Sequence, residues 1–146
     1  MSLWAIVPVK PLRRSKSRLA EVLTPEERNA LNRGLLENTI KTLIDIPEIA
    51  HVLVVSRDHA ALALARSLGA RTVQENGAPQ LNVALSRATV IAKTYATQSV
   101  LVLPADLPLI TPEDVQVMLS RAFDPPVVVV APDHNQKGTN ALLLSP

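Results

Sequence analysis

The sequence contains no cysteine and few glycines, and both shortages exclude whole classes of functional site. Without cysteine, the 146 residues can hold no disulfide framework, no thiolate metal centre and no cysteine nucleophile. The four glycines lie far apart in the chain, so they cannot form a P-loop or a dinucleotide-binding fingerprint. A phosphate ligand would therefore have to be bound by lysine, arginine and helix N-termini rather than by a glycine-rich loop.

Aromatic residues and long apolar runs are also scarce. Trp4, Tyr95 and Phe123 are the only aromatics, too few for a stacking platform that would bind single-stranded nucleic acid. No uncharged apolar run reaches the length of about 18 residues that a membrane helix needs. The N-terminus lacks the basic-then-apolar layout of a signal peptide. We therefore expect a cytoplasmic protein with neither a nucleic acid nor a membrane as its partner.

The length and the composition are typical of one globular domain over residues 1–146. Apolar residues make up 47% of the chain, which is enough to offset chain entropy and to exclude disorder. The net charge is only +2, but a third of the basic residues are concentrated in one acid-free stretch near the N-terminus. These residues are Lys10, Arg13, Arg14, Lys16 and Arg18.

Short apolar runs alternate with helical patterns, which predicts an α/β fold with a parallel sheet. The four strong runs are almost entirely apolar, as is typical of strands that are buried on both faces. Prolines lie at the ends of these runs, where no ladder hydrogen bond is lost. The predicted strands are Leu3–Val7, His51–Val55, Ser99–Leu103 and Val127–Ala131, with weaker ones at Arg71–Gln74 and Thr139–Leu144.

Helix starts are marked by capping residues. Thr24 and Thr111 are each followed by a proline and then by acidic residues, the pattern of a capping box. A further helix begins after Asp58 and ends at Gly69, and another covers about residues 81–96. The first helix is expected to bury one apolar stripe. That stripe consists of Leu31, Leu35, Leu36, Ile40, Leu43 and Ile44.

Ligands of open α/β sheets bind beyond the carboxyl ends of the strands, so the segments after strands are the candidate sites. These segments are Pro8–Arg18, Ser56–Asp58, Pro104–Pro108 and Pro132–Thr139. In the first, Lys10, Lys16 and Arg18 could neutralise a triphosphate and its leaving pyrophosphate. The alternatives are a solvated basic loop and, more weakly, a nucleic-acid contact.

The other segments offer a carboxylate and several neutral polar groups. Asp106 is flanked by prolines after a buried strand, which suits a divalent metal ligand or, alternatively, a turn aspartate bonded to its own backbone. Thr139 and Asn140 follow Gly138 and could donate to a small anionic substrate, or could belong to an ordinary polar loop. Asn82, at a predicted helix start, could bind a base or a ribose, or could cap the helix.

Taken in order, these segments resemble the guanylyltransferases of coenzyme F-420 biosynthesis, which couple GTP to 2-phospholactate or phosphoenolpyruvate. The resemblance spans essentially the whole chain. It implies a three-layer α/β sandwich with a mostly parallel sheet, of the nucleotide-diphospho-sugar transferase (glycosyltransferase-A-like) type. The matching segments are Trp4–Lys10, Lys16–Leu19, Leu81–Asn82, Leu103–Pro108 and Gly138–Asn140.

The resemblance also implies residue roles. Lys10, Lys16 and Asp106 would be catalytic, with Asp106 as the ligand of Mg2+. Thr139 and Asn140 would bind the phospho-acid. The implied reaction is in-line attack of the substrate phosphate on the α-phosphorus of GTP, with pyrophosphate as the leaving group. The nucleotide-binding residues would be Pro8, Lys10, Lys16, Ser17, Arg18 and Asn82.

The chain departs from the family pattern in two places. Gln80 stands where the family has glycine, and family members continue beyond residue 146 with a substrate loop and a second metal-binding aspartate. We therefore expect a member that lacks the C-terminal part of the fold. Two functions stay open: a guanylyltransferase, or a non-catalytic GTP-binding or assembly remnant. The apolar final strand leaves an edge at which a homodimer could form.

Overall fold

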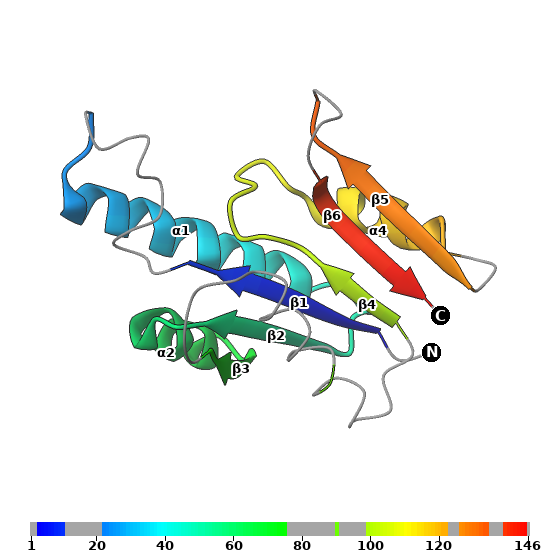
Figure 1. Cartoon of the computed structure of the whole chain (residues 1–146), viewed down its shortest axis with the longest axis horizontal. Coiled ribbons are helices and arrows are strands. Elements are labelled where there is room, and N and C mark those ends of the chain that lie inside the picture. Colours follow the sequence, from blue (N-terminus) through cyan, green and yellow to red (C-terminus); the bar gives the residue numbers. More distant parts are fainter. Residues whose placement is uncertain are drawn as a thin grey trace.

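Strands and helices alternate over residues 3–74 and 99–132, as the sequence predicts, and two successive strands end the described chain (Figure 1). The computed structural model describes residues 3–10, 22–75, 90, 99–122, 126–134 and 139–145. The strands are β1 (Leu3–Val9), β2 (His51–Ser56), β3 (Arg71–Gln74), β4 (Ser99–Val102), β5 (Val127–Pro132) and β6 (Thr139–Ser145). The helices are α1 (Pro25–Ile44), α2 (His59–Ser67) and α4 (Pro112–Ser120).

The described strands form one six-stranded sheet in the order β3-β2-β1-β4-β6-β5. β1 pairs in parallel with β2 and with β4, and β2 pairs in parallel with β3. β6 runs antiparallel between β4 and β5, so the expectation that the final strand leaves an open edge for a homodimer is wrong. Only residues 133–138 separate β6 from β5, and so short a connection joins antiparallel strands, because a parallel pair needs a longer crossover. The predicted mostly parallel sheet is therefore confirmed, with β6 as the exception.

The capping boxes predicted for α1 and α4 are both present. Thr24 Oγ1 accepts the N–H of Glu27 at 3.1 Å, and Glu27 Oε1 accepts the N–H of Thr24 at 2.9 Å. Thr111 and Asp114 form the same reciprocal pair at the start of α4. The hydrogen bond from the Thr24 backbone lowers the pKa of Glu27, because it stabilises the charged carboxylate. None of the described helices is apolar over a length that could cross a membrane.

The α2 helix also begins and ends as predicted. Asp58 Oδ1 caps its start by accepting the N–H of Ala60 at 2.9 Å. Gly69 follows its end with φ of 95°, in the left-handed region that favours glycine. Among the described residues, a Cβ at Gly69 would meet only the Ile44 side chain, at an ordinary 3.8 Å. The backbone conformation, rather than crowding, is therefore what requires glycine at this position.

The buried stripe of α1 differs at its ends from the prediction. Leu31 and Ile44 are 39% and 43% exposed and Leu35 is half-buried, whereas Leu36, Ile40 and Leu43 are buried. Asn32 and Thr39 are buried instead, because they lie four and three positions from the central leucine of the stripe. Thr39 Oγ1 donates to the carbonyl of Leu35 at 2.9 Å, so its buried hydroxyl is satisfied.

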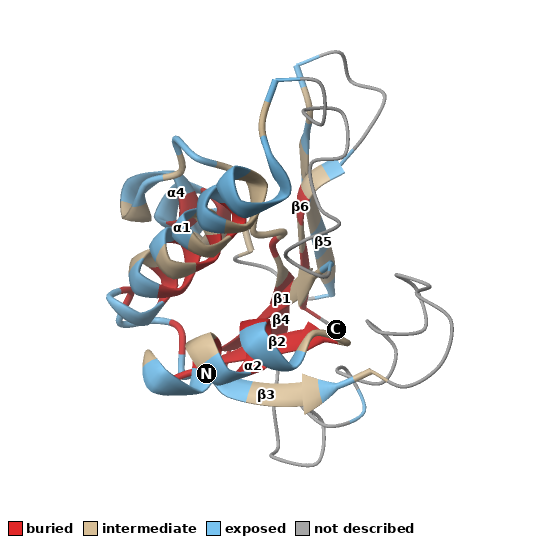
Figure 2. Ribbon diagram, turned by 90° about the vertical axis from the view of Figure 1, so that its left-hand side faces the viewer, coloured by how far each residue is buried: buried red, intermediate tan, exposed pale blue. Residues whose placement is uncertain are grey.

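The two faces of the sheet carry separate apolar clusters. On one, which we call the helix face, strand residues such as Ala5 and Leu101 are buried together with side chains of α1, α2 and α4. Figure 2 shows α1 and α4 on one side of the sheet, with the buried residues in red. On the other, which we call the Trp4 face, Trp4 and Leu53 belong to a second buried cluster. The helix predicted over about residues 81–96, which would complete the three layers, lies outside the described residues except for one position.

β5 contradicts the prediction that the strongly apolar strands are buried on both faces. Val128 and Val130 are 59% and 50% exposed, while Val129 and Ala131 between them pack against the core of the helix face. β5 is the outermost strand of the described sheet, next to β6 alone. Its apolar run therefore resembles that of a central strand although only one of its faces is covered.

Candidate functional site

The carboxyl ends of β1, β2, β3 and β4 lie along one edge of the sheet, which we call the carboxyl edge (Figure 1). Val9 pairs with Ser56, and Ser56 with Gln74, so the first three strands end level with one another. Leu103, directly after β4, donates its N–H to the carbonyl of Ile6 at 3.0 Å. Segments that leave all four strands are therefore neighbours, at the edge where ligands of such sheets bind.

Pro8 and Lys10 lie at the end of β1. Pro8 is the penultimate residue of the strand, paired with Val55, rather than the first residue beyond it as the sequence predicts. Lys10 directly follows the strand and is exposed. It forms no ion pair or hydrogen bond with any other residue that the structure describes. Its ammonium group is therefore available to an anion at the carboxyl edge.

Asp106 lies on the segment that follows β4. Leu103 before it is buried, Leu107 after it packs against the core of the helix face, and the Leu107 carbonyl accepts the N–H of Ile110 at 3.3 Å. These contacts anchor the segment on both sides and leave Asp106 exposed. Its carboxylate has no hydrogen bond within the described ranges, so the alternative of a turn aspartate bonded to its backbone is not seen there.

Thr139 and Asn140 begin β6, and because β6 is antiparallel to β4, its first residues lie at the carboxyl edge. Val102 pairs with Leu142, so Asn140 lies level with the segment that leads to Asp106. Thr139 is exposed, whereas Asn140 is half-buried and lines a cavity of about 370 Å³. The structure therefore places both residues one strand away from Asp106.

The cavity beside Asn140 lies between α4 and the sheet and is mainly apolar. Leucines of β4 and of the following segment form much of its wall, together with Val115 and Met118 of α4. Asp114 also lines it, but that carboxylate accepts the N–H of Thr111 at 3.0 Å in the helix cap. No lysine or arginine is among the described residues of its lining. The cavity alone is therefore unsuited to a phosphate group.

Four of the predicted site residues lie outside the described residues. They are Lys16, Ser17, Arg18 and Asn82. The remaining predicted residues lie on three successive strands of the sheet: Lys10 follows β1, Asp106 follows β4, and Thr139 begins β6. The part of the predicted site that the structure describes is therefore brought together at one edge.

The described side chains could hold Mg2+ only with help from a ligand. Among the described residues, no group of three histidine, aspartate or glutamate side chains could hold a metal by itself. The predicted metal site therefore rests there on the exposed Asp106. Mg2+ is often bound by one or two carboxylates together with substrate phosphates and water. This donor set fits Mg2+ that arrives with a nucleotide, and does not form an all-protein cage.

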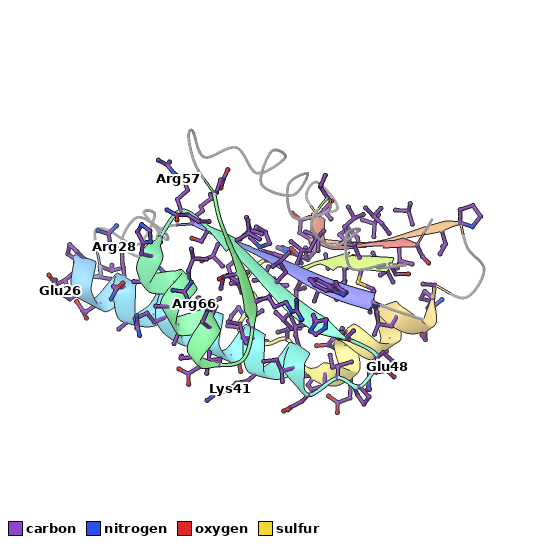
Figure 3. The ribbon with its side chains drawn as sticks, turned by 90° about the horizontal axis from the view of Figure 1, so that it is seen from below. Glu26, Arg28, Lys41, Glu48, Arg57 and Arg66 are labelled. Atoms are coloured by element: carbon purple, nitrogen blue, oxygen red, sulfur yellow. The ribbon has the colours of Figure 1, made fainter. Side chains whose placement is uncertain are left out.

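Two charged residues at the carboxyl edge were given no individual role by the sequence analysis, although Arg57 lies within the candidate segment Ser56–Asp58. Arg57 directly follows β2 (Figure 3), and Glu75 directly follows β3. The N–H of Glu75 donates to the carbonyl of Ser56 at 2.9 Å. Glu75 Oε1 is closed off from solvent and has no hydrogen-bond partner within the described part of the chain. The short weak strand before Glu75 was the available signal, since its carboxyl end is also a candidate site.

Comparison with known proteins identifies relatives along the whole chain. A family model described as "Guanylyl transferase CofC like" matches residues 3–146. The phosphoenolpyruvate guanylyltransferase of Rubrobacter xylanophilus is 44% identical over 146 residues, which are 100% of this chain and 70% of that protein. The 2-phospho-L-lactate guanylyltransferase of Methanothermobacter thermautotrophicus is 36% identical over 146 residues, which are 63% of its length. The chain thus spans about two thirds of such relatives.

Solved structures show the same fold at low sequence identity. A nucleotide-diphospho-sugar transferase from Desulfovibrio desulfuricans superposes with a TM-score of 0.78 at 18% identity, over 99% of this chain and 64% of that one. The CMP:2-keto-3-deoxy-manno-octonic acid synthetase complexed with CTP gives a TM-score of 0.61 at 13% identity, over 99% and 74%. The α/β fold is therefore of the nucleotide-diphospho-sugar transferase type.

Proposed function

Because the chain belongs to the family of CofC-like guanylyl transferases, we propose that it transfers GMP from GTP to a three-carbon phospho-acid and releases pyrophosphate. Relatives are named for phosphoenolpyruvate and for 2-phospho-L-lactate. These two acids are the acceptors that we propose for this chain, in the biosynthesis of coenzyme F-420. The two acids differ only in whether one carbon–carbon bond is double or single, so the experiment below compares them directly.

The observation that supports this proposal is the convergence of three residues at the carboxyl edge. Lys10, Asp106 and Thr139 come from β1, β4 and β6, which are successive strands of the sheet. At the usual spacing of neighbouring strands, the ends of these three strands span about 10 Å. The phosphates of a nucleotide and a small acceptor can occupy that length together. A cation, a carboxylate and a hydroxyl are thus available in the order that the reaction needs.

The proposed reaction needs no protein nucleophile. A phosphate oxygen of the acceptor forms a bond to the α-phosphorus of GTP. The bond from that phosphorus to the bridging oxygen breaks, and pyrophosphate leaves with the electron pair. Lys10 would offset negative charge on the phosphates, and Thr139 with Asn140 would orient the acceptor. Asp106 would hold Mg2+, which when bound neutralises charge on the phosphates.

The proposal is tested by pyrophosphate release. The protein is incubated with GTP, Mg2+ and either phosphoenolpyruvate, 2-phospho-L-lactate or 3-phosphoglycerate. We expect release with at least one of the first two acids and none with the third. The absence of release with all three, from protein whose circular dichroism shows it folded, would contradict the proposal. GTP binding without any release would instead indicate a non-catalytic GTP-binding module.

A matched pair of lysine variants separates a role at the site from a general effect of charge. Lys10→Gln removes the cation at the carboxyl edge, and Lys41→Gln removes an exposed cation in the last turn of α1, where Lys41 Nζ lies 2.7 Å from Glu37 Oε1. We expect pyrophosphate release to slow by about tenfold to a hundredfold in Lys10→Gln, as for the loss of one charged hydrogen bond. Lys41→Gln should release pyrophosphate at the normal rate. Equal rates in both variants would argue against Lys10 as a phosphate-binding residue.

A further inference from the structure

The strand pleat places Lys10, Arg57 and Glu75 on the same side of the sheet. Side chains alternate between the two faces along a strand. In β1, Trp4 and Ile6 belong to the cluster of the Trp4 face, so Lys10 follows in the same alternation. In β2, Leu53 and Val55 belong to that cluster and precede Arg57 by even steps. Lys10 and Arg57 each come one residue after the end of their strand, and continuing the alternation by that one position directs both cations toward the Trp4 face.

The third strand follows the same rule. Val73 packs against the cluster of the Trp4 face. Gln74 points the other way, toward the helix face, where its Nε2 lies 3.3 Å from Nε2 of His59 in α2. Glu75, two residues after Val73, therefore comes next on the Trp4 face. Figure 3 shows Arg57 at the carboxyl edge, on the side of the sheet away from α1. An arginine and a glutamate thus follow two neighbouring strands, at one end of the proposed site and on one face.

The carboxylate of Glu75 is poorly satisfied within the protein. Its Oε1 is closed off from solvent and accepts no hydrogen bond from the described residues. Arg57 follows β2, the strand that pairs with β3, but the described residues include no ion pair between Arg57 and Glu75. A buried oxygen without a donor is costly, and such an atom in a folded protein calls for an explanation. Glu75 as a whole is only half-buried, so a ligand whose N–H donors displaced the atoms that cover Oε1 would satisfy it.

We propose that Glu75, together with Arg57, recognises the guanine base of GTP. This inference rests on the proposed function, and it names the residues that would select the base. The N1–H and 2-amino groups of guanine would donate to the Glu75 carboxylate, and the Arg57 guanidinium would donate to guanine O6. Adenine presents an amino group in place of O6 and an acceptor at N1, so it would oppose both residues. The acceptor on Glu75 and the donors on Arg57 therefore match the hydrogen-bonding groups of guanine and not those of adenine.

The position of the pair agrees with the rest of the proposed site. Along the sheet, β3 and β2 come first, then β1 with Lys10, then β4 with Asp106, and then β6 with Thr139. From β3 to β4 is three strand spacings, or about 14 Å. That separation leaves room for a ribose between a base at Glu75 and phosphates near Lys10 and Asp106. Base, phosphates and acceptor would then lie in sequence along one edge.

The test is nucleotide binding by the full chain, measured by calorimetry with GTP, inosine triphosphate, xanthosine triphosphate and ATP. Inosine lacks the 2-amino group, and xanthosine carries an oxygen there. The unmodified protein should bind GTP more tightly than the other three. In Glu75→Gln, affinity for GTP should fall by about tenfold to a hundredfold, as expected for hydrogen bonds to a charged group. Xanthosine triphosphate should bind Glu75→Gln more tightly than the unmodified protein, because the glutamine amide can donate to the added oxygen.

Glu48→Gln is the matched control, because Glu48 is exposed and lies at the opposite end of the sheet from Arg57 (Figure 3). It should leave all four affinities unchanged. Arg57→Gln is a second variant, in which GTP should lose affinity while ATP does not. Unchanged GTP affinity in Glu75→Gln, or an equal loss for all four nucleotides, would overturn the inference. So would an unmodified protein that binds none of them.

The two proposals can fail separately. Pyrophosphate release by the unmodified protein reports on the proposed function and does not depend on any Glu75 variant. Release from GTP with unaltered base preference in Glu75→Gln would keep the function and remove the assignment of Glu75. A shift of preference from GTP toward xanthosine triphosphate in Glu75→Gln, without pyrophosphate release by the unmodified protein, would keep the assignment and remove the activity.

Discussion

Asp106→Asn should abolish most of the activity without weakening the fold. Asp106 is exposed, and its carboxylate makes no hydrogen bond or ion pair with the other described residues. Surface substitutions of this kind change the free energy of unfolding by less than about 0.5 kcal/mol. In the proposed reaction the same carboxylate would hold Mg2+ beside the phosphates. Loss of one such electrostatic contact costs about a hundredfold to a thousandfold in kcat.

The assay measures pyrophosphate release as a function of Mg2+ concentration, together with urea denaturation of each variant. Asp45→Asn is the control, because Asp45 is also exposed but lies at the C-terminal cap of α1. We expect Asp106→Asn to show a low kcat and a raised Mg2+ requirement at an unchanged urea midpoint, and Asp45→Asn to keep its activity. Normal kcat and normal Mg2+ dependence in Asp106→Asn would refute the metal assignment. A large fall in the urea midpoint of Asp106→Asn would refute the claim that Asp106 does not contribute to the stability of the fold.

Three further predictions concern stability and are checked by urea denaturation. Gly69→Ala should lower the free energy of unfolding by about 1 kcal/mol, since φ is 95° there; a neutral result would show that the backbone adapts. Thr24→Ala should lower the free energy of unfolding by about 1 kcal/mol, because it removes the hydroxyl that accepts the N–H of Glu27, and Thr24→Ser should restore most of it. Partial burial, and then the charge of Arg71, lower the pKa of His51 below its usual range. Protonation of His51 therefore favours the unfolded chain, so the free energy of unfolding should fall as pH drops below about 6.5. His51→Gln should flatten that dependence, and an unaltered pH profile would contradict it.

Local patterns in the sequence were sufficient for most of the element bounds. The capping residues of α1 and α4, the left-handed Gly69 and the strand over Arg71–Gln74 all follow from short-range chemistry, and the structure has each of them. The exposure of Leu31 and Val128 could not be predicted in the same way. It depends on which neighbour an element packs against, and identical apolar patterns arise in central and outermost strands.

The candidate site divides in the same manner. Lys10 and Asp106 could be found from the sequence because each follows an apolar run, and the carboxyl ends of such strands gather at one edge. The sequence offers less reason to select Glu75 as a site residue. Its preceding strand is short, and the closed-off oxygen that draws attention to it is a property of the folded chain. The apolar cavity beside Asn140 likewise depends on how α4 packs against the sheet.

The most direct test of the central claim follows the acceptor phosphate itself. Phosphoenolpyruvate or 2-phospho-L-lactate labelled in its phosphate is incubated with GTP, Mg2+ and the protein, and the mixture is then treated with a phosphatase that removes terminal phosphates. GMP transfer converts the labelled phosphate into an internal anhydride, so the label should become resistant to the phosphatase and should elute with guanine absorbance. Label that stays fully sensitive to the phosphatase, at every protein concentration and with both acids, would contradict the claim that this chain is a guanylyltransferase.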